Sequence, residues 1–173
     1  MPESYRAPIR KDKQSDRTFS QSSSTNLSAD KANVAKILAQ KGGEVFSIGP
    51  GETLGRAVEV LRDRRIGALL VTDTAGALVG ILSERDIVRK LAETPGQTLP
   101  QLVQDVMTKN VETCTQDETL LSVLKRMTAG RFRHVPVVEG GVLKGMVTIG
   151  DVINFRLTEL EHETLQLKQL IVG

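Results

Sequence analysis

Two kinds of hydrophobic pattern alternate along the chain, and their order occurs twice. One is a stripe of apolar residues at positions i, i+3, i+4 and i+7, which is typical of a helix packed by one face. The other is a short continuous apolar run, which indicates a strand covered on both faces. The two stripes are Leu54, Ala57, Val58 and Leu61, then Leu120, Val123, Leu124 and Met127. Two similar units are therefore predicted.

Each stripe is followed by two apolar runs joined at a glycine, and then by a second helix. The predicted strands are residues 66–72, 78–82, 132–138 and 142–147, and the helices that follow them are 85–92 and 149–170. A short strand at 45–48 precedes the first stripe, and Gly51 and Asp117 stand where helix N-caps belong. Val34, Ile37 and Leu38 predict a short lead-in helix. Each unit is thus an α+β unit of strand, helix, strand, strand and helix.

A short motif ends the last strand of each unit. Residues 80–86 (GILSERD) reappear as residues 145–151 (GMVTIGD), each with a Gly, two apolar residues, a hydroxyl residue and an Asp three positions later. A single hydroxyl-x-x-Asp motif is weak, but one that recurs inside two matching frames is strong.

These motifs, with Arg133-His134-Val135-Pro136-Val137-Val138 and Val106-Met107-Thr108, resemble a tandem pair of CBS domains, the unit called a Bateman module. The resemblance covers about residues 33–160 and implies an α+β fold in which two β-α-β-β-α repeats pack face to face with pseudo-two-fold symmetry. The predicted parts are a disordered Ser-rich tail (1–30), repeat 1 with its lead-in helix (31–94), a linker (95–104), repeat 2 (105–160) and a helical extension (161–173).

Ser83 with Asp86, and Thr148 with Asp151, have two interpretations. Each pair could be a helix capping box, in which hydroxyl and acid satisfy free N–H groups. Alternatively, the hydroxyl and the helix N-terminus form an anion site, and the Asp accepts the hydroxyls of a ribose. A single copy would favour the capping box. The resemblance implies that Asp holds ribose and that Ser or Thr meets phosphate, and with two copies in one frame we favour the nucleotide.

The resemblance also implies that backbone amides and small apolar side chains contact an adenine ring. The residues concerned are Ser47, Ile48, Ile66, Gly67, Ala68, Thr113 and Cys114. Ordinary strand packing is the alternative, nearly as strong for Ile48 and Ile66. Cys114 has no base or metal-ligand neighbour in sequence, so we interpret it as a small buried hydrophobe, and no metal is predicted.

Arg131, Arg133 and His134 form a candidate phosphate clamp, because arginine binds phosphate bidentately. Side chains alternate along a strand, so Arg131 and Arg133 should share one face and His134 the other, and we do not expect all three at one site. A solvated strand edge is the alternative. The first repeat has Arg65 and Gly67 there, so the two sites should differ in phosphate handling. The candidate ligand-binding set also includes Arg85, Val135, Pro136 and Ile149.

Composition narrows the classes of function. Aromatic residues make up 3% of the 173 residues and the net charge is +2, which disfavours a nucleic-acid-binding surface. Basic and acidic residues alternate in the tail, which disfavours a nucleic-acid arm or an organellar transit peptide. The single cysteine and the strand-length apolar runs predict a cytoplasmic protein without a membrane span.

We therefore predict a regulatory or sensor module, not an enzyme, that binds an adenine nucleotide in one or both clefts between the repeats. AMP is the first choice, with ATP, ADP and NAD(H) as alternatives, and the output is a change in shape or in affinity for an unknown downstream protein. One rival is a dehydrogenase of the inosine monophosphate type, whose barrel needs roughly 200 residues of its own. Another is an interaction or nucleic-acid module using the tail. A homodimer is predicted from apolar outer helices and the C-terminal stripe Leu157, Leu160, Leu165, Leu167 and Leu170.

Overall fold

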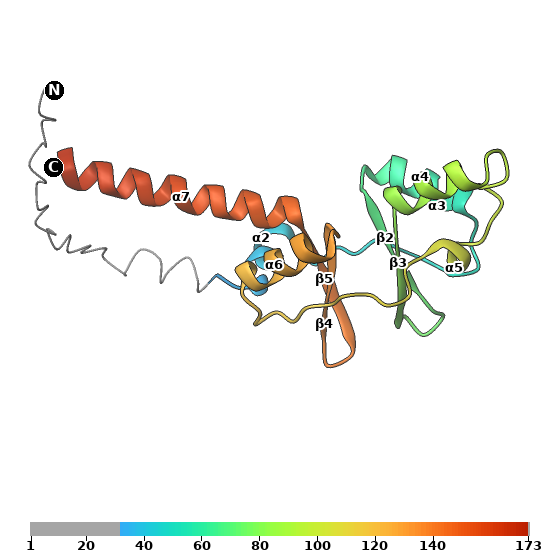
Figure 1. Ribbon diagram of the computed structural model, residues 1–173. Helices are drawn as coiled ribbons and strands as arrows, with labels where there is room; N and C mark the ends of the chain where they lie inside the picture. Colours follow the sequence, from blue (N-terminus) through green and yellow to red (C-terminus); the bar gives the residue numbers. More distant parts are fainter. Residues whose placement is uncertain (1–31, 173) are drawn as a thin grey trace, which may run out of the picture.

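The computed structural model describes residues 32–172, so the predicted tail at 1–30 lies outside the described residues. Figure 1 shows two α+β halves side by side, with one long helix projecting beyond the second half. The elements are α2 (Val34–Lys41), β1 (Ser47–Ile48), α3 (Leu54–Arg64), β2 (Ala68–Thr72), β3 (Leu78–Ser83), α4 (Glu84–Glu93), α5 (Val103–Val106), α6 (Leu120–Gly130), β4 (His134–Glu139), β5 (Val142–Thr148) and α7 (Ile149–Val172). The α+β pair of repeats is confirmed. The order of elements differs from the prediction in two places: α5 was not predicted, and the first strand of repeat 2 is reduced to an isolated bridge at Cys114.

The two sheets repeat one topology. In the first sheet, β1 pairs parallel with β2, and β2 pairs antiparallel with β3. The second sheet is the antiparallel pair β4 and β5. Its counterpart of β1 is reduced to Cys114, which forms a parallel bridge to Val137 just as Ile48 pairs with Val71. Cys114 follows Ile48, and Val137 follows Val71, by the same number of residues. The hydrogen bonds therefore follow the pseudo-symmetry of the sequence.

The N-caps of the two striped helices differ from the prediction. The side chain of Thr53 accepts a hydrogen bond from the Arg56 N–H at 3.2 Å, and Thr119 accepts one from the Ser122 N–H at 3.3 Å. Gly51 and Asp117 are therefore not the caps. A glycine has no side-chain acceptor, and the hydroxyl residue directly before the first helical residue has the geometry to reach the free N–H groups.

Each half of the molecule is completed by the segment that leads into the other repeat. Val34 and Leu38 of α2 are buried in the core of repeat 2, whereas Val103 of α5 is buried in the core of repeat 1. We call this arrangement, in which each lead-in segment packs in the core of the other repeat, the exchange. Backbone hydrogen bonds fix both segments: the Leu120 N–H donates to the Ala32 carbonyl at 2.9 Å, and the Val103 N–H donates to the Glu52 carbonyl at 2.8 Å. Sequence analysis grouped α2 with repeat 1, but its packing partners lie in repeat 2. Neither repeat has a complete core alone.

The exchange explains why the repeated motif begins with glycine. A Cβ on Gly145 would lie 2.7 Å from a methyl of Leu38, and a Cβ on Gly80 would overlap the side chain of Met107. Leu38 and Met107 belong to the two exchanged segments. The glycine in each motif therefore leaves the space into which the opposite lead-in segment packs.

We expect Gly80→Ala and Gly145→Ala each to lower the free energy of unfolding by about 1–3 kcal/mol, the usual range for overpacking a core. Gly51→Ala is the matched control, because no atom lies within 4 Å of the added Cβ and its φ is not positive. Chemical denaturation measures the change. If Leu38 is the clashing group, Gly145→Ala combined with Leu38→Ala will cost less than the sum of the single changes; additive losses would contradict this explanation.

Candidate functional site

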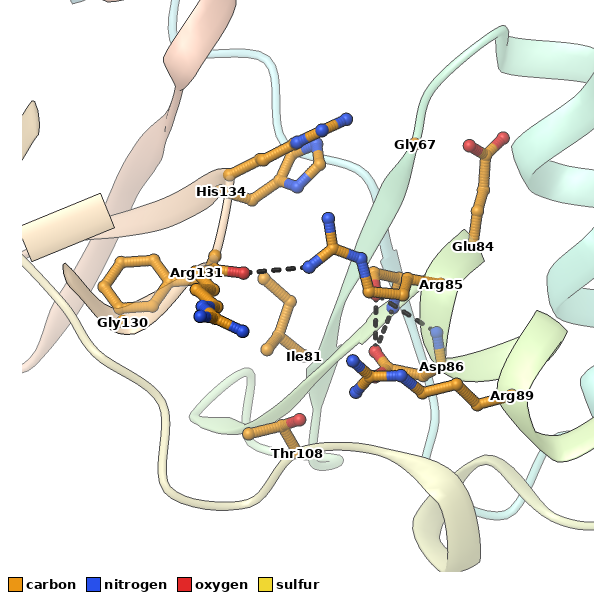
Figure 2. A pocket seen from close by; sticks show the side chains of 13 residues that line it. Gly67, Ile81, Glu84, Arg85, Asp86, Arg89, Thr108, Gly130, Arg131 and His134 are labelled. Carbon is orange, nitrogen blue, oxygen red and sulfur yellow. Dashed lines mark hydrogen bonds between the residues drawn. The ribbon is translucent and has the colours of Figure 1, made fainter. Parts of the chain in front are cut away.

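A cleft of about 490 Å³ lies between the two repeats (Figure 2). Repeat 1 supplies the end of β3 and the first two turns of α4, and repeat 2 supplies the connection from α6 to β4. The lining residues are Gly67, Ile81, Ser83, Glu84, Arg85, Asp86, Arg89, Thr108, Gly130, Arg131, Phe132, Arg133 and His134. This first cleft therefore contains the motif of repeat 1 and the candidate clamp of repeat 2.

Ser83 and Asp86 form the capping box that begins α4. Asp86 Oδ2 accepts hydrogen bonds from the Ser83 N–H at 2.9 Å and from the Ser83 hydroxyl at 2.6 Å, and Ser83 Oγ accepts from the Asp86 N–H at 3.4 Å. Within residues 32–172, both hydrogen bonds that the Asp86 carboxylate accepts fall on Oδ2. The capping geometry thus fixes the carboxylate and leaves Oδ1 as an acceptor at the cleft wall.

The first cleft is rich in arginine. Arg85, Arg89, Arg131 and Arg133 line it against two carboxylates, those of Glu84 and Asp86. Arg85 crosses between the repeats and donates from Nη1 to the Arg131 carbonyl at 2.9 Å, as Figure 2 shows. That carbonyl belongs to the left-handed residue (φ 56°) that ends α6. The excess of two positive charges suits an anionic ligand.

His134 is the first residue of β4, and its ring faces the same cleft. Burial lowers the pKa of His134, the Lys41 ammonium lowers it further, Asp151 acts in the opposite direction, and Arg133 adds to the lowering. A Cβ on Gly67 would lie 3.5 Å from the His134 ring and 3.6 Å from Glu84. Gly67 therefore stands at a narrow point between the two repeats.

The motif of repeat 2 has the same backbone geometry but a different partner. Asp151 Oδ2 accepts from the Thr148 N–H at 2.8 Å, and Thr148 Oγ1 accepts from the Asp151 N–H at 3.1 Å. In addition, Lys41 Nζ donates to Asp151 Oδ2 at 2.7 Å and to the Met146 carbonyl at 3.2 Å. Partial burial would raise the pKa of Asp151, but the bonds from Lys41 and Thr148 together hold it below its usual value.

The lengths of the two lead-in helices account for this difference. α2 has 8 residues, and its last residue is Lys41. α5 has only 4 residues, after which the chain runs along β3 and the Thr108 N–H donates to Ile81 at 2.9 Å. The second turn of α2 therefore carries an ammonium to Asp151, while α5 ends before it could bring a side chain to Asp86.

Seven of the residues named in sequence analysis line the first cleft: Gly67, Ser83, Arg85, Asp86, Arg131, Arg133 and His134. The expectation that His134 would face away from the two arginines is wrong. β4 begins only at His134, so the alternation rule does not apply to Arg131, which is the C-cap residue of α6. Thr148, at the end of β5, and Ile149 and Asp151, at the start of α7, do not line this cleft.

The other named residues do not line the first cleft. Ile48, Ala68, Cys114, Val135 and Pro136 are buried, Ile66 and Thr113 are partly buried, and Ser47 is exposed. Burial raises the pKa of Cys114 to about 11, so the prediction of a small buried residue is confirmed.

Sequence reasoning missed several lining residues, of which Arg89 had a visible signal. Arg89 follows Asp86 by three positions on α4, and residues at that spacing share one face of a helix. The positions missed without such a signal are Ile81, Glu84, Thr108, Gly130 and Phe132.

Comparison with known proteins decides the family. The CBS-domain family model matches residues 34–93 and 103–158. The chain belongs to the CBS-domain family. It therefore contains a tandem CBS pair, and the first cleft lies between the two CBS repeats.

Two of the similar proteins come from Arabidopsis thaliana. The Arabidopsis thaliana protein CBSCBSPB5 is 32% identical over 147 residues, covering 81% of this chain and 26% of the relative. The mitochondrial Arabidopsis protein CBSX3 is 33% identical over 126 residues, covering 70% of this chain and 61% of the relative. The chain thus spans about a quarter of the first of these relatives.

Two solved structures have the same fold. A CBS-domain-containing protein from Agrobacterium tumefaciens is 42% identical with a TM-score of 0.71, over 73% of this chain and 94% of the other. A CBS domain pair in complex with 5′-methylthioadenosine and S-adenosyl-L-methionine is 27% identical with a TM-score of 0.66, over 74% of this chain and 98% of the other. No helix within residues 32–172 combines the length and apolar character needed to cross a membrane.

The Lys41–Asp151 ion pair gives a pH-dependent prediction for this CBS pair. We expect Lys41→Met to lower the free energy of unfolding at pH 7 by about 0.2–1 kcal/mol, as for other partly exposed pairs. The pKa of Asp151 is lower in the folded state, so the stabilisation is complete above about pH 4 and is lost as the pH falls further. Denaturation at several pH values, with Lys36→Met on the same helix as control, measures it. A difference that persists at pH 2 would contradict the ion-pair explanation.

Proposed function

We propose that this CBS pair is a regulatory module that binds an adenine nucleotide in its first cleft, with AMP as the first choice and ATP, ADP or NAD(H) as alternatives. The observation that carries the proposal is the arrangement of Asp86, fixed through Oδ2 with Oδ1 remaining, beside four arginines at one interface between repeats. No catalytic residue is proposed.

The chemistry of the cleft suits the parts of a nucleotide. A carboxylate oxygen at a fixed position accepts hydrogen bonds from the two hydroxyls of a ribose. Arginine side chains bind phosphate oxygens through paired N–H groups. The cleft volume of about 490 Å³ is within the usual range for small-molecule sites, roughly 300–1,000 Å³. The excess of two positive charges matches the charge of a phosphate monoester.

The solved CBS pair that holds 5′-methylthioadenosine and S-adenosyl-L-methionine supports an adenosine ligand. Those two ligands carry no phosphate. Four arginines would be needless for a neutral adenosine and unfavourable for a sulfonium cation, because like charges repel each other. We therefore infer that the phosphate-bearing members of the adenosine class are preferred here.

We propose one nucleotide in each chain. In repeat 2, the carboxylate of Asp151 already binds the Lys41 ammonium. The residue of repeat 2 that corresponds to Gly67 is Arg133, and it lines the first cleft. A ribose at Asp151 would have to displace or share the Lys41 ammonium. We therefore propose that the two sites differ in phosphate handling, with the arginines acting at the first cleft.

The regulatory output is proposed to be a change in the relation between the repeats. Arg85 and Arg131 join the repeats across the cleft by a single hydrogen bond, and a phosphate between their guanidinium groups would compete with the Arg131 carbonyl for Arg85. A ligand that binds one arrangement better shifts the population toward it. A cytoplasmic setting, a homodimer and a downstream protein partner remain part of this proposal.

The arginines allow the phosphate to be tested separately from the base. Arg133→Ala should weaken AMP binding about tenfold or more, equivalent to roughly 1.4 kcal/mol, and leave adenosine binding almost unchanged. Arg133→Lys should recover only part of the loss, since a point charge does not reproduce the planar fork. Isothermal titration of both ligands measures this. Equal losses for AMP and adenosine would show that Arg133 supports the fold or the base.

A comparison of Asp86→Ala with Asp151→Ala tests the ribose contact and the number of nucleotide sites. Asp86→Ala should weaken AMP binding by about 1.5–3 kcal/mol, the range for a hydrogen bond to a charged group. Asp151→Ala should leave both the affinity and a stoichiometry of one unchanged. The same calorimetric titrations give both quantities. Loss of stability without loss of affinity in Asp86→Ala would mean that the capping box is its whole role, and two sites in the unmodified protein would refute the single-cleft proposal.

A further inference from the structure

The outer part of α7 carries an apolar surface that the described chain does not cover. Val152 and Phe155, in its first two turns, pack on the core of repeat 2. Beyond them, Leu157, Leu160 and Leu167 are 54%, 54% and 55% exposed. Figure 1 shows α7 continuing away from both sheets. Three exposed leucines on one helix face are more than an isolated surface residue would explain.

The exposed positions follow a heptad pattern. Ile153, Leu160 and Leu167 occupy one core position of the repeat, and Leu157, Thr164 and Ile171 occupy the other, with alternating spacings of four and three residues. At about 100° per residue, all six lie within an arc of about 80°, on the side of α7 away from Val152 and Phe155. Spacing of this kind is the signature of a two-helix coiled coil. We call these six residues the α7 seam.

The charged residues beside the seam would meet residues of opposite charge in a second copy of the helix. In a parallel pair of identical helices, each g position faces the e position five residues further along the partner. Arg156 would then face Glu161 of a second copy, and Glu163 would face Lys168. Both pairings join opposite charges. Arg156 also binds Glu159 within its own helix at 3.2 Å, and its five N–H donors allow both contacts.

The residue types at the seam favour a parallel dimer. Ile171 and Thr164 are β-branched at one core position, and Leu160 and Leu167 occupy the other, which is the combination that prefers two strands. The first heptad, with Leu157 and Ile153, has the reverse order, so this preference comes from the outer two-thirds of the seam. The parallel arrangement also places Thr164 opposite itself, so that the two hydroxyls can pair, whereas an antiparallel arrangement would place each against a leucine.

We propose that the α7 seam is the docking surface for a second copy of this chain, through a parallel coiled coil of the two α7 helices. The seam runs for about 27 Å along the helix, given a rise of about 1.5 Å per residue. This is a short coiled coil, so it acts together with the CBS pairs to which it is joined by Ile149 at the base of α7. The proposal does not depend on nucleotide binding.

Sedimentation of the full chain over a range of concentrations tests the seam. Leu160→Glu with Leu167→Glu should weaken dimerisation more than tenfold, because both leucines and the added charges would face the partner. His162→Glu with Gln169→Glu is the matched control: both residues are exposed, seven positions apart on the same helix, and lie on the face opposite the seam, so their change should have little effect. All these side chains are exposed, so an unchanged melting temperature of the CBS pair is expected. A monomeric unmodified protein, or equal effects of seam and control changes, would overturn the proposal.

A charge exchange tests the orientation. Glu161→Lys with Lys168→Glu keeps the net charge but makes both parallel pairings repulsive, so the dimer should weaken several-fold. Adding Arg156→Glu and Glu163→Lys should restore it. In an antiparallel pair, e positions face e positions, and the first exchange would still join opposite charges. An unweakened dimer after the first exchange would therefore overturn the parallel coiled coil.

Discussion

The structure depends on the reciprocal packing of each lead-in segment against the core of the other repeat. Leu38 fills the space above Gly145, and Met107 fills the space above Gly80. Without these contacts, each repeat of about 60 residues would leave much of its apolar surface in water. The exchange also holds the two repeats in a fixed relation. The cleft between the repeats is therefore a consequence of how the two cores are completed. No further rigid contact across the cleft is needed to form it.

The same exchange gives the two repeated motifs different partners. α2 and α5 occupy equivalent places, but α2 is one turn longer and carries Lys41 to Asp151. At the position equivalent to Gly67, repeat 2 has Arg133, whose guanidinium lines the cleft of repeat 1. The change from Gly to Arg adds a positive charge to the first cleft, and the longer helix gives the carboxylate of Asp151 a cationic partner. The pseudo-symmetric backbone is unaffected by either change.

Much of this could be predicted from the sequence, and the errors have identifiable causes. Periodicity and the repeated motif were sufficient to predict both repeats, because hydrophobic spacing reports directly on which faces are buried. The exchange of α2 was not predicted, since a stripe such as Val34, Ile37 and Leu38 shows that a helix packs but not against which core. His134 was misplaced because the strand was predicted to start two residues too early, and a rule of alternation fails outside the strand. The Lys41–Asp151 pair joins residues far apart in the sequence, which no local pattern reveals.

The first cleft and the α7 seam lie at the two ends of a short chain of contacts. Arg133 lines the cleft with its side chain, and its carbonyl accepts a hydrogen bond at 2.9 Å from the N–H of Ile149, the first residue of α7. Two residues further on, Asp151 joins α7 to Lys41 of α2, which is packed in the core of repeat 2. If a ligand moved the backbone at Arg133, this hydrogen bond would transmit the movement to the first turn of α7, and the Lys41–Asp151 ion pair would resist rotation of that turn. Because α7 is one continuous helix of 24 residues, a rotation at its base would be carried along its length to the proposed seam.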